Sequence, residues 1–196
     1  MTHPFYTIGH SDRSLEAFGA LLVTAGVQQL VDVRKMPRSR ANPQFNGDTL
    51  ADALAPLGIG YAYAAPLGGL RGRDATVPAS INGYWSNRSF HNYADYALSA
   101  PFRTGLEQLV EDGRPVTCAV MCAESVWWRC HRRIIADYLL AAGEQVIHVL
   151  GPGSETPGSL SEGAVPENGL LTYPEPLSPA PEAESHRSSR AAFSRT

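Results

Sequence analysis

Residues 115–133 read PVTCAVMCAESVWWRCHRR, and this stretch decides the fold. Its first part, Pro115 to Met121, is a continuous apolar run typical of a buried strand. Its second part opens a segment with helical apolar spacing, which predicts a helix over 126–142. A strand that leads directly into a helix indicates an α/β protein, in which chemistry gathers at the carboxyl ends of the strands. Cys122 stands at such an end.

The rest of the chain repeats this alternation. Apolar runs predict strands over 5–8, 27–33, 59–64, 115–121 and 145–150, and helical periodicity predicts helices over 15–25, 49–57, 89–96, 101–111 and 126–142. Strands that alternate with helices form parallel sheets, and right-handed crossovers bring all strand carboxyl ends to one edge. We therefore expect a three-layer, doubly wound, mostly parallel five-stranded sheet of Rossmann-like architecture.

Composition predicts one folded domain and an appendage. The chain has 196 residues, of which 43% are hydrophobic and 18% are charged, enough for one buried core. From Gly151 onward there are seven prolines, five glycines and eight serines but few large apolar residues. Such a segment buries too little surface to offset its ordering entropy. We expect a single α/β domain over 1–150 and a disordered tail over 151–196.

The amino terminus has no charged-then-apolar leader, and there is no apolar run of about 18 residues. The sequence thus predicts a cytoplasmic protein without a membrane partner. In that compartment Cys118, Cys122 and Cys130 are expected to be reduced. Their thiol chemistry is then available.

The net charge of −3 is unevenly spread. Residues 1–150 contain 13 basic and 13 acidic side chains, and the deficit lies wholly in residues 151–196. A neutral core disfavours coating of a nucleic-acid duplex. Lys35 is the single lysine of the chain, so positive charge is carried by guanidinium groups, which suit planar contacts to phosphate or carboxylate. We expect a small anionic or nucleotide-like ligand; nucleic acid is possible but not favoured.

The predicted topology brings polar residues from several strand ends to one crevice. We expect catalytic roles for Cys122, Cys130, Glu124 and His10, and substrate binding by Ser11, Arg34, Arg38, Arg40, Gly68, Gly69, Arg71, His131 and Arg132. Phe45, Tyr61, Tyr84 and Trp85 are candidate walls. Arginines on converging loops indicate an anion site.

Structural roles compete with these functional ones. Alternation along a strand places Cys118 deeper in the sheet than Cys122 and predicts core packing for Cys118. Asp32 lies in an apolar strand, where a carboxylate needs a cation, so pairing with Arg34 or Arg38 is expected. Cys130 either fills a gap between helix and sheet or, in a first helical turn beside arginines, has a lowered pKa.

Several of these motifs occur together in one known family. Tyr6-Thr-Ile-Gly-His-Ser11, Val31-Asp-Val-Arg34, Leu67-Gly-Gly69, Met121-Cys-Ala-Glu124 and Cys130-His-Arg132 resemble, in that order, the family known as domain of unknown function 488. The resemblance spans about residues 4–150. It implies an α/β fold and a shared set of polar residues, and it implies nothing about substrate.

Three classes of function fit the crevice. In a thiol enzyme, Cys122 or Cys130 is the nucleophile, His10 or His131 the base and Glu124 an orienting group, while arginines hold a phosphorylated substrate. The Cys-x5-Arg loop of phosphatases is absent, because position 128 is Trp128. In a binding or regulatory module, the same crevice binds a nucleotide or a nucleic-acid end without catalysis.

The third class is a metal protein that uses Cys122, Cys130, His131 and His10. On a helix, the adjacent residues Cys130 and His131 point about 100° apart and chelate one ion poorly, so the sequence disfavours this class. No metal site and no cofactor is predicted. The sequence makes no prediction of oligomeric state.

Overall fold

A computed structural model describes residues 3–176 and shows a mixed α/β fold. The strands are β1 (Phe5–Gly9), β2 (Gln29–Asp32), β3 (Gly60–Tyr63), β4 (Cys118–Cys122), β5 (Val146–Gly151), β6 (Ser154–Pro157), β7 (Val165–Glu167) and β8 (Leu170–Thr172). The helices are α1 (Leu15–Thr24), α2 (Gly47–Leu54), α3 (Arg88–Ala97), α4 (Ala100–Gly113) and α5 (Arg132–Ala141). Short 3-10 turns η1 to η5 cover Pro43–Phe45, Ala55–Leu57, Ala65–Leu67, Ala79–Asn82 and Trp127–Arg129.

The main sheet has the strand order β3-β2-β4-β1-β5-β6. The five strands β1 to β5 are parallel, and β6 adds an antiparallel edge to β5. This confirms the mostly parallel, doubly wound sheet expected from the alternation of strands and helices. The sixth strand was not predicted.

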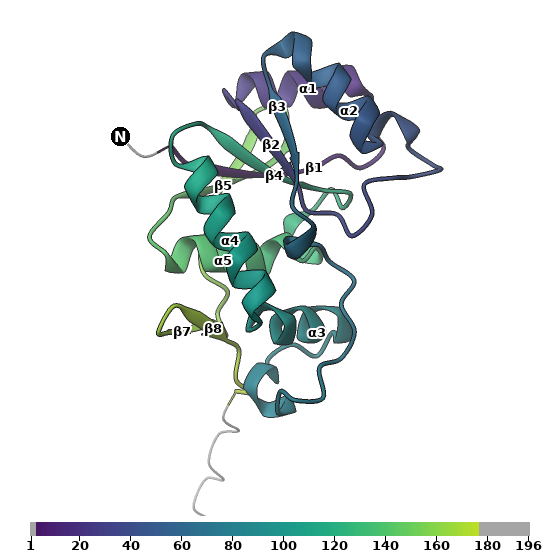
Figure 1. Ribbon diagram of the computed structural model, residues 1–196. Coiled ribbons are helices and arrows are strands. Elements are labelled where there is room, and N and C mark those ends of the chain that lie inside the picture. The colour runs from purple at the N-terminus through teal and green to yellow at the C-terminus, as the bar shows by residue number, and fades with distance from the viewer. Residues whose placement is uncertain (1–2, 177–196) are drawn as a thin grey trace, which may run out of the picture.

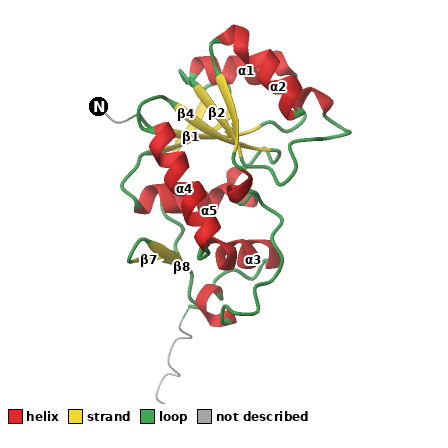
Figure 2. Ribbon diagram, viewed as in Figure 1, coloured by secondary structure: helices red, strands yellow, loops and turns green. Residues whose placement is uncertain are grey.

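Helices cover both faces of the sheet, which gives three layers (Figures 1 and 2). One core cluster joins α1 and α2 to one face through residues such as Phe18, Leu22 and Leu50. The other joins α3, α4 and α5 to the opposite face. Within β4, Cys118, Val120 and Cys122 face the second cluster while Ala119 and Met121 face the first, as period-two alternation predicts.

The neighbouring strands β1 and β4 continue into helices on opposite faces of the sheet, since β1 leads to α1 and β4 leads to α5. A crevice forms where two adjacent strands send their connections to opposite sides. Backbone hydrogen bonds from His10 to Cys122 (3.0 Å) and from Ser11 to Ala123 (2.9 Å) extend this strand pair beyond the sheet. The two loops that follow β1 and β4 are therefore held side by side.

The predicted boundary at residue 150 is wrong for the residues that follow it. Strand β6 pairs with β5, and β7 and β8 form a hairpin. Leu171 and Tyr173 lie in the core that α3, α4 and α5 cover, and Tyr173 is fully buried. The low average apolar content of residues 151–196 did not indicate that Leu171 and Tyr173 are buried. The part of the predicted tail over 177–196 lies outside the described residues.

Candidate active site

An open cleft of about 800 Å³ lies at the carboxyl ends of the strands, within the size range of small-molecule sites. Nine of the residues expected at a site line it: His10, Ser11, Arg34, Arg38, Gly69, Cys122, Glu124, Cys130 and His131. They come from the loops after four different strands. The predicted crevice thus exists where the topology places it.

Cys130 does not lie in a helix, and the prediction of one continuous helix over 126–142 is wrong. Trp127–Arg129 forms a single 3-10 turn, Cys130 is extended with φ −127° and ψ 147°, and α5 begins only at Arg132. Trp127 stacks on His148 of β5 with ring centroids 4.1 Å apart. This stacking holds the turn against the sheet. Because Cys130 has an extended backbone after the turn, both Cys130 and His131 line the cleft.

His131 faces both cleft cysteines. Its Nδ1 atom lies 3.6 Å from Cys130 Sγ and 4.0 Å from Cys122 Sγ. Its Nε2 atom lies 2.9 Å from the carbonyl oxygen of Val33, 98 positions away in sequence. Because a carbonyl oxygen only accepts hydrogen bonds, Nε2 carries the proton. In the neutral ring the lone pair of Nδ1 is therefore directed at the sulfur atoms.

Gly69 gives this imidazole its space. A Cβ atom at position 69 would lie 2.7 Å from His131 Nδ1, closer than atoms in contact approach one another. Tyr93 packs against the imidazole with ring centroids 4.9 Å apart. Gly69 therefore leaves room for the His131 ring, a role different from the substrate binding expected from the sequence.

The pKa values of the two cleft thiols, Cys122 and Cys130, are shifted in opposite directions. A hydrogen bond from Cys122 to Cys130 lowers the pKa of Cys130 well below its usual range and raises the pKa of Cys122. His131 and Arg132 lower the pKa of Cys130 further. A lowered pKa raises the fraction of thiolate, so Cys130 is the more reactive thiol of the pair. Cys118, fully buried in β4, has a pKa raised to about 12 by burial.

Arg132 lies beneath the cleft rather than in it. It is 1% exposed, donates from Nε to Cys130 Sγ at 3.4 Å and donates from Nη2 to the carbonyl of Glu124. Direct contact between Arg132 and a substrate, which the sequence predicted, is thus prevented by burial. Its guanidinium acts on the cysteine instead.

His10 is buried and held on both ring nitrogens. Its Nδ1 lies 2.7 Å from the carbonyl oxygen of Ser11, its Nε2 lies 3.3 Å from Nη1 of Arg34, and its ring stacks on Phe45 at 4.2 Å. The Ser11 carbonyl requires a proton on Nδ1, so Nε2 accepts from Arg34. Burial lowers the pKa of His10. Both nitrogens are occupied, which leaves His131 as the imidazole placed to take a proton from a thiol.

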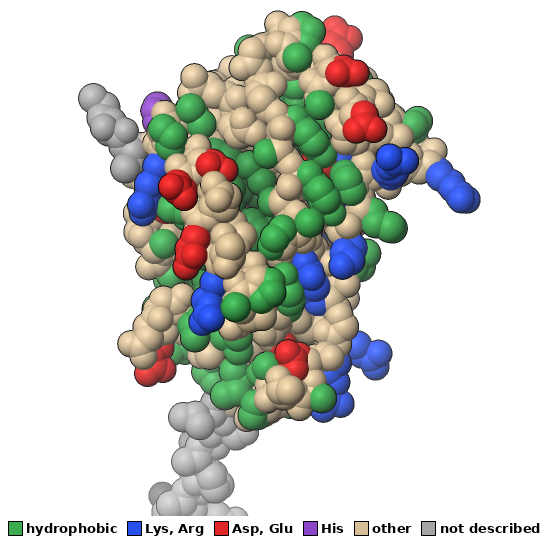
Figure 3. All heavy atoms as spheres, in the orientation of Figure 1, with side chains coloured by type: hydrophobic (Ala, Val, Ile, Leu, Met, Phe, Trp, Pro, Cys, Tyr) green, Lys and Arg blue, Asp and Glu red, His purple; other side chains and the backbone are tan. Residues whose placement is uncertain are grey.

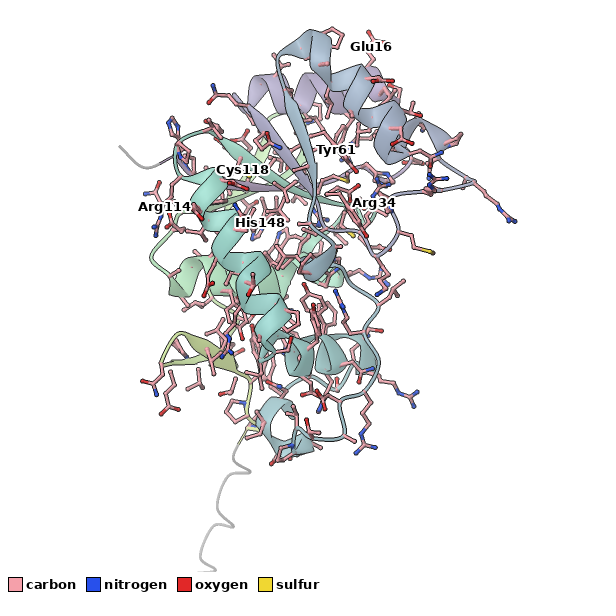
Figure 4. The ribbon with its side chains drawn as sticks, in the orientation of Figure 1. Glu16, Arg34, Tyr61, Arg114, Cys118 and His148 are labelled. Atoms are coloured by element: carbon pink, nitrogen blue, oxygen red, sulfur yellow. The ribbon has the colours of Figure 1, made fainter. Side chains whose placement is uncertain are left out.

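Arg34 is the cation that the buried Asp32 requires. The pair meets at 2.5 Å, Tyr61 donates to the same carboxylate at 2.8 Å, and Arg34 also donates to the Phe45 carbonyl. The expected pairing of Asp32 with Arg34 is therefore confirmed. Figure 4 shows Arg34 and Tyr61 at one end of the sheet, with Cys118 further along it.

Three other predicted ligand residues are not in the cleft. Arg71 is turned onto the Tyr96 ring at 3.6 Å and donates to the carbonyls of Ala65, Pro66 and Gly68. Gly68 is buried next to it, and Arg40 does not line the cleft but an adjoining hollow that shares Arg38 and Ser39 with it. A turn made of carbonyl groups satisfies a guanidinium as well as an anion does, and sequence spacing does not distinguish the two.

The cleft also contains residues that sequence reasoning did not select. They are Asp12, Lys35, Met36, Ser39, Asn42, Leu70, Ser89, Phe90, Tyr93, Ala123, Ser125 and Arg129. Phe90 and Tyr93 line the cleft, whereas the aromatic walls expected from the sequence do not: Phe45, Tyr61, Tyr84 and Trp85. Lys35 and Arg129 were detectable, since each directly adjoins a predicted site residue in sequence.

The fold and the site define an α/β protein with two thiols and two imidazoles in a cleft at its strand ends. The chain belongs to the family described as Domain of unknown function DUF488, whose model matches residues 14–139. A comparison with curated proteins and with solved structures finds no match. Among residues 3–176, no helix has both the length and the apolar character needed to cross a membrane.

Proposed function

We propose that the cleft is the active site of a thiol-dependent hydrolase or transferase for a phosphorylated or nucleotide-like substrate. The single observation that carries this proposal is the arrangement of His131. The Val33 carbonyl fixes one ring nitrogen and directs the other at Cys130 and Cys122. A nucleophile, a base and a group that orients the base form the constellation of covalent catalysis.

Arg132 supports the choice of Cys130 as the nucleophile. A buried cation requires a nearby anion, because desolvation of an uncompensated charge costs several kcal/mol. Arg132 makes no salt bridge to any carboxylate within residues 3–176, and the acidic group that it contacts is the Cys130 thiol. A thiolate at Cys130 satisfies this requirement. Cys122, whose pKa is raised, remains a thiol that donates to it.

The proposed first step is a displacement. The proton of Cys130 has moved to His131 Nδ1, and the thiolate forms a bond to the electrophilic atom of the substrate. The bond from that atom to the leaving group breaks, and the proton on Nδ1 passes to the leaving group. Water or a second acceptor then attacks the covalent adduct and releases Cys130.

The charges around the cleft support an anionic substrate. Lys35, Arg38 and Arg129 are exposed at the cleft, and their side chains have no hydrogen-bond or salt-bridge partner among residues 3–176. Asp12 and Glu124 are the acidic residues that line it. Figure 3 shows basic side chains mainly along the right-hand edge of one face, apart from most of the acidic ones. Each charge-assisted hydrogen bond contributes about 1.5–3 kcal/mol.

Brief alkylation with limiting iodoacetamide at pH 6.5, in the presence of a metal chelator, tests the nucleophile. Mass mapping should find Cys130 labelled first, Cys122 slowly and Cys118 only after unfolding. His131→Gln, whose amide can retain the hydrogen bond to Val33, should slow the labelling of Cys130. Equal and slow labelling of all three cysteines would exclude the thiol enzyme.

A screen of phosphate esters, nucleotides and acyl esters tests the reaction. Turnover should vanish in Cys130→Ser. Arg38→Ala and Arg129→Ala should each weaken substrate binding about tenfold or more, whereas Arg40→Ala, on the same loop as Arg38 but outside the cleft, should not. A nucleotide that stabilises the wild-type and Cys130→Ser proteins equally, without turnover, would instead indicate a binding module.

A further inference from the structure

Three soft donor atoms converge at the floor of the cleft. Cys122 Sγ, Cys130 Sγ and His131 Nδ1 all lie within 4.8 Å of one another. The two sulfur–nitrogen distances are 3.6 and 4.0 Å. The expectation that Cys130 and His131 would diverge on a helix is wrong, because Cys130 is extended and precedes α5. Thiolate and imidazole are the ligands that Zn²⁺ prefers.

The spacing suits a tetrahedral ion. Zinc–sulfur bonds of about 2.3 Å and zinc–nitrogen bonds of about 2.0–2.1 Å place a sulfur and a nitrogen ligand roughly 3.5 Å apart, and two sulfur ligands roughly 3.8 Å apart. The observed separations reach these values with side-chain shifts on the order of 1 Å or less. Little backbone movement is needed, so the ligand set is nearly preorganised.

The atoms around the three donors are also those of a metal site. Metal-binding histidines usually donate their second ring nitrogen to a carbonyl or carboxylate, which fixes the tautomer that leaves a lone pair for the ion. The hydrogen bond from His131 Nε2 to the Val33 carbonyl meets this requirement. Arg132 donates to Cys130 Sγ at 3.4 Å, which stabilises this sulfur as a thiolate. Cys122 loses its proton when the ion binds, as thiol ligands do.

The fourth coordination position opens to the cleft. Among residues 3–176 no further histidine, cysteine or carboxylate joins this cluster, and all three ligands line the cleft. Two thiolates neutralise a divalent ion, and the buried charge of Arg132 then remains. An anion in the fourth position would balance that charge.

We propose that Cys122, Cys130 and His131 bind one Zn²⁺ ion, with an anion from the cleft as its fourth ligand. The ion occupies the sulfur and nitrogen lone pairs that thiol chemistry needs. Bound Zn²⁺ therefore blocks alkylation of Cys130 and inhibits the enzyme. The binding of the ion stands independently of the proposed function, whereas its inhibitory effect rests on that function.

Titration of the reduced, untagged, chelator-treated full chain with Co²⁺ tests the site. We expect one ion per chain, the intense visible bands of tetrahedral Co²⁺, thiolate-to-cobalt charge transfer in the near ultraviolet, and displacement by Zn²⁺. Cys122→Ser, Cys130→Ser and His131→Gln should each weaken binding more than tenfold. Cys118→Ser, which removes the buried thiol of the same strand, should leave the spectrum unchanged.

Wild-type protein that binds no ion, or gives the weak spectrum of octahedral Co²⁺, would overturn the proposal, and this outcome does not depend on any variant folding. Equal loss of binding in Cys118→Ser and Cys122→Ser would do so as well. The titration contains no substrate, so a failure of the proposed enzyme leaves its result unaffected. Alkylation in chelator, conversely, tests the thiol independently of the metal.

Discussion

Arg132 Nε lies 3.4 Å from Cys130 Sγ, and Arg132 has no carboxylate partner within residues 3–176. The buried guanidinium and the thiolate therefore stabilise each other. Besides Cys122 and His131, a residue that does not line the cleft thus contributes to the lowered pKa of Cys130.

We predict that Arg132→Gln raises the pKa of Cys130, because removal of a nearby cation destabilises the thiolate. The midpoint of the alkylation rate against pH should move upward. Arg133→Gln is the matched control, since Arg133 donates to Ser161 and contacts Trp85 instead. A midpoint that moves equally in both variants would contradict a direct effect of Arg132.

Asp32→Asn should destabilise the protein by about 3–5 kcal/mol, because it leaves the buried Arg34 without its counter-charge. Urea unfolding measures this loss. Asp52→Asn, an exposed site on α2, should change stability by less than about 0.5 kcal/mol. The double variant Asp32→Leu with Arg34→Met should recover much of the loss. If its loss of stability instead equals the sum of the losses in Asp32→Leu and Arg34→Met measured singly, the ion pair is not the cause.

His148 makes stability depend on pH in the acid range. It is buried, and burial lowers its pKa from 6.5 to about 4. Between these values the unfolded chain binds a proton that the folded chain does not. The contribution of neutral His148 is therefore complete above about pH 6.5 and is lost as the pH falls toward 4.

We predict that wild-type stability falls over this window with a slope that includes one proton, about 1.4 kcal/mol per pH unit. His148→Gln should have a shallower slope by that amount, as measured by urea unfolding at a series of pH values. Identical slopes for the two proteins would show that His148 does not carry the effect.

Tyr173 tests the contribution of the carboxyl-terminal segment to the core. It is fully buried, packs against Trp85 and donates to Asp137 at 2.9 Å. Tyr173→Ala should cost about 3–5 kcal/mol of unfolding free energy. Tyr173→Phe should cost about 1–3 kcal/mol, because Asp137 then lacks one donor.

Leu160→Ala is the control for Tyr173, since Leu160 lies in the same segment and is 41% exposed. It should cost less than either substitution at Tyr173 in the same unfolding measurement. If all three variants were as stable as the wild-type protein, residues 151–176 would not belong to the cooperative fold.

The amino-acid pattern alone determined the architecture and the location of the cleft. Apolar runs and helical spacing are local properties, and the parallel arrangement follows from their alternation. The helix predicted over 15–25 is α1, and Ser14 caps it with its side chain accepting from the Ala17 amide. The pairing of Asp32 with Arg34 was also predictable, because the two residues are near in sequence and a buried carboxylate needs a cation.

Only the tertiary structure decided which polar side chains meet in the cleft. Arg71 satisfies its guanidinium on local carbonyls, Arg132 is buried under Cys130, and Tyr173 returns to the core. His131 is oriented by a hydrogen bond that it donates to the Val33 carbonyl, 98 positions away. Local sequence sets backbone periodicity, but the direction and ionisation of a side chain depend on groups that folding brings from distant parts of the chain.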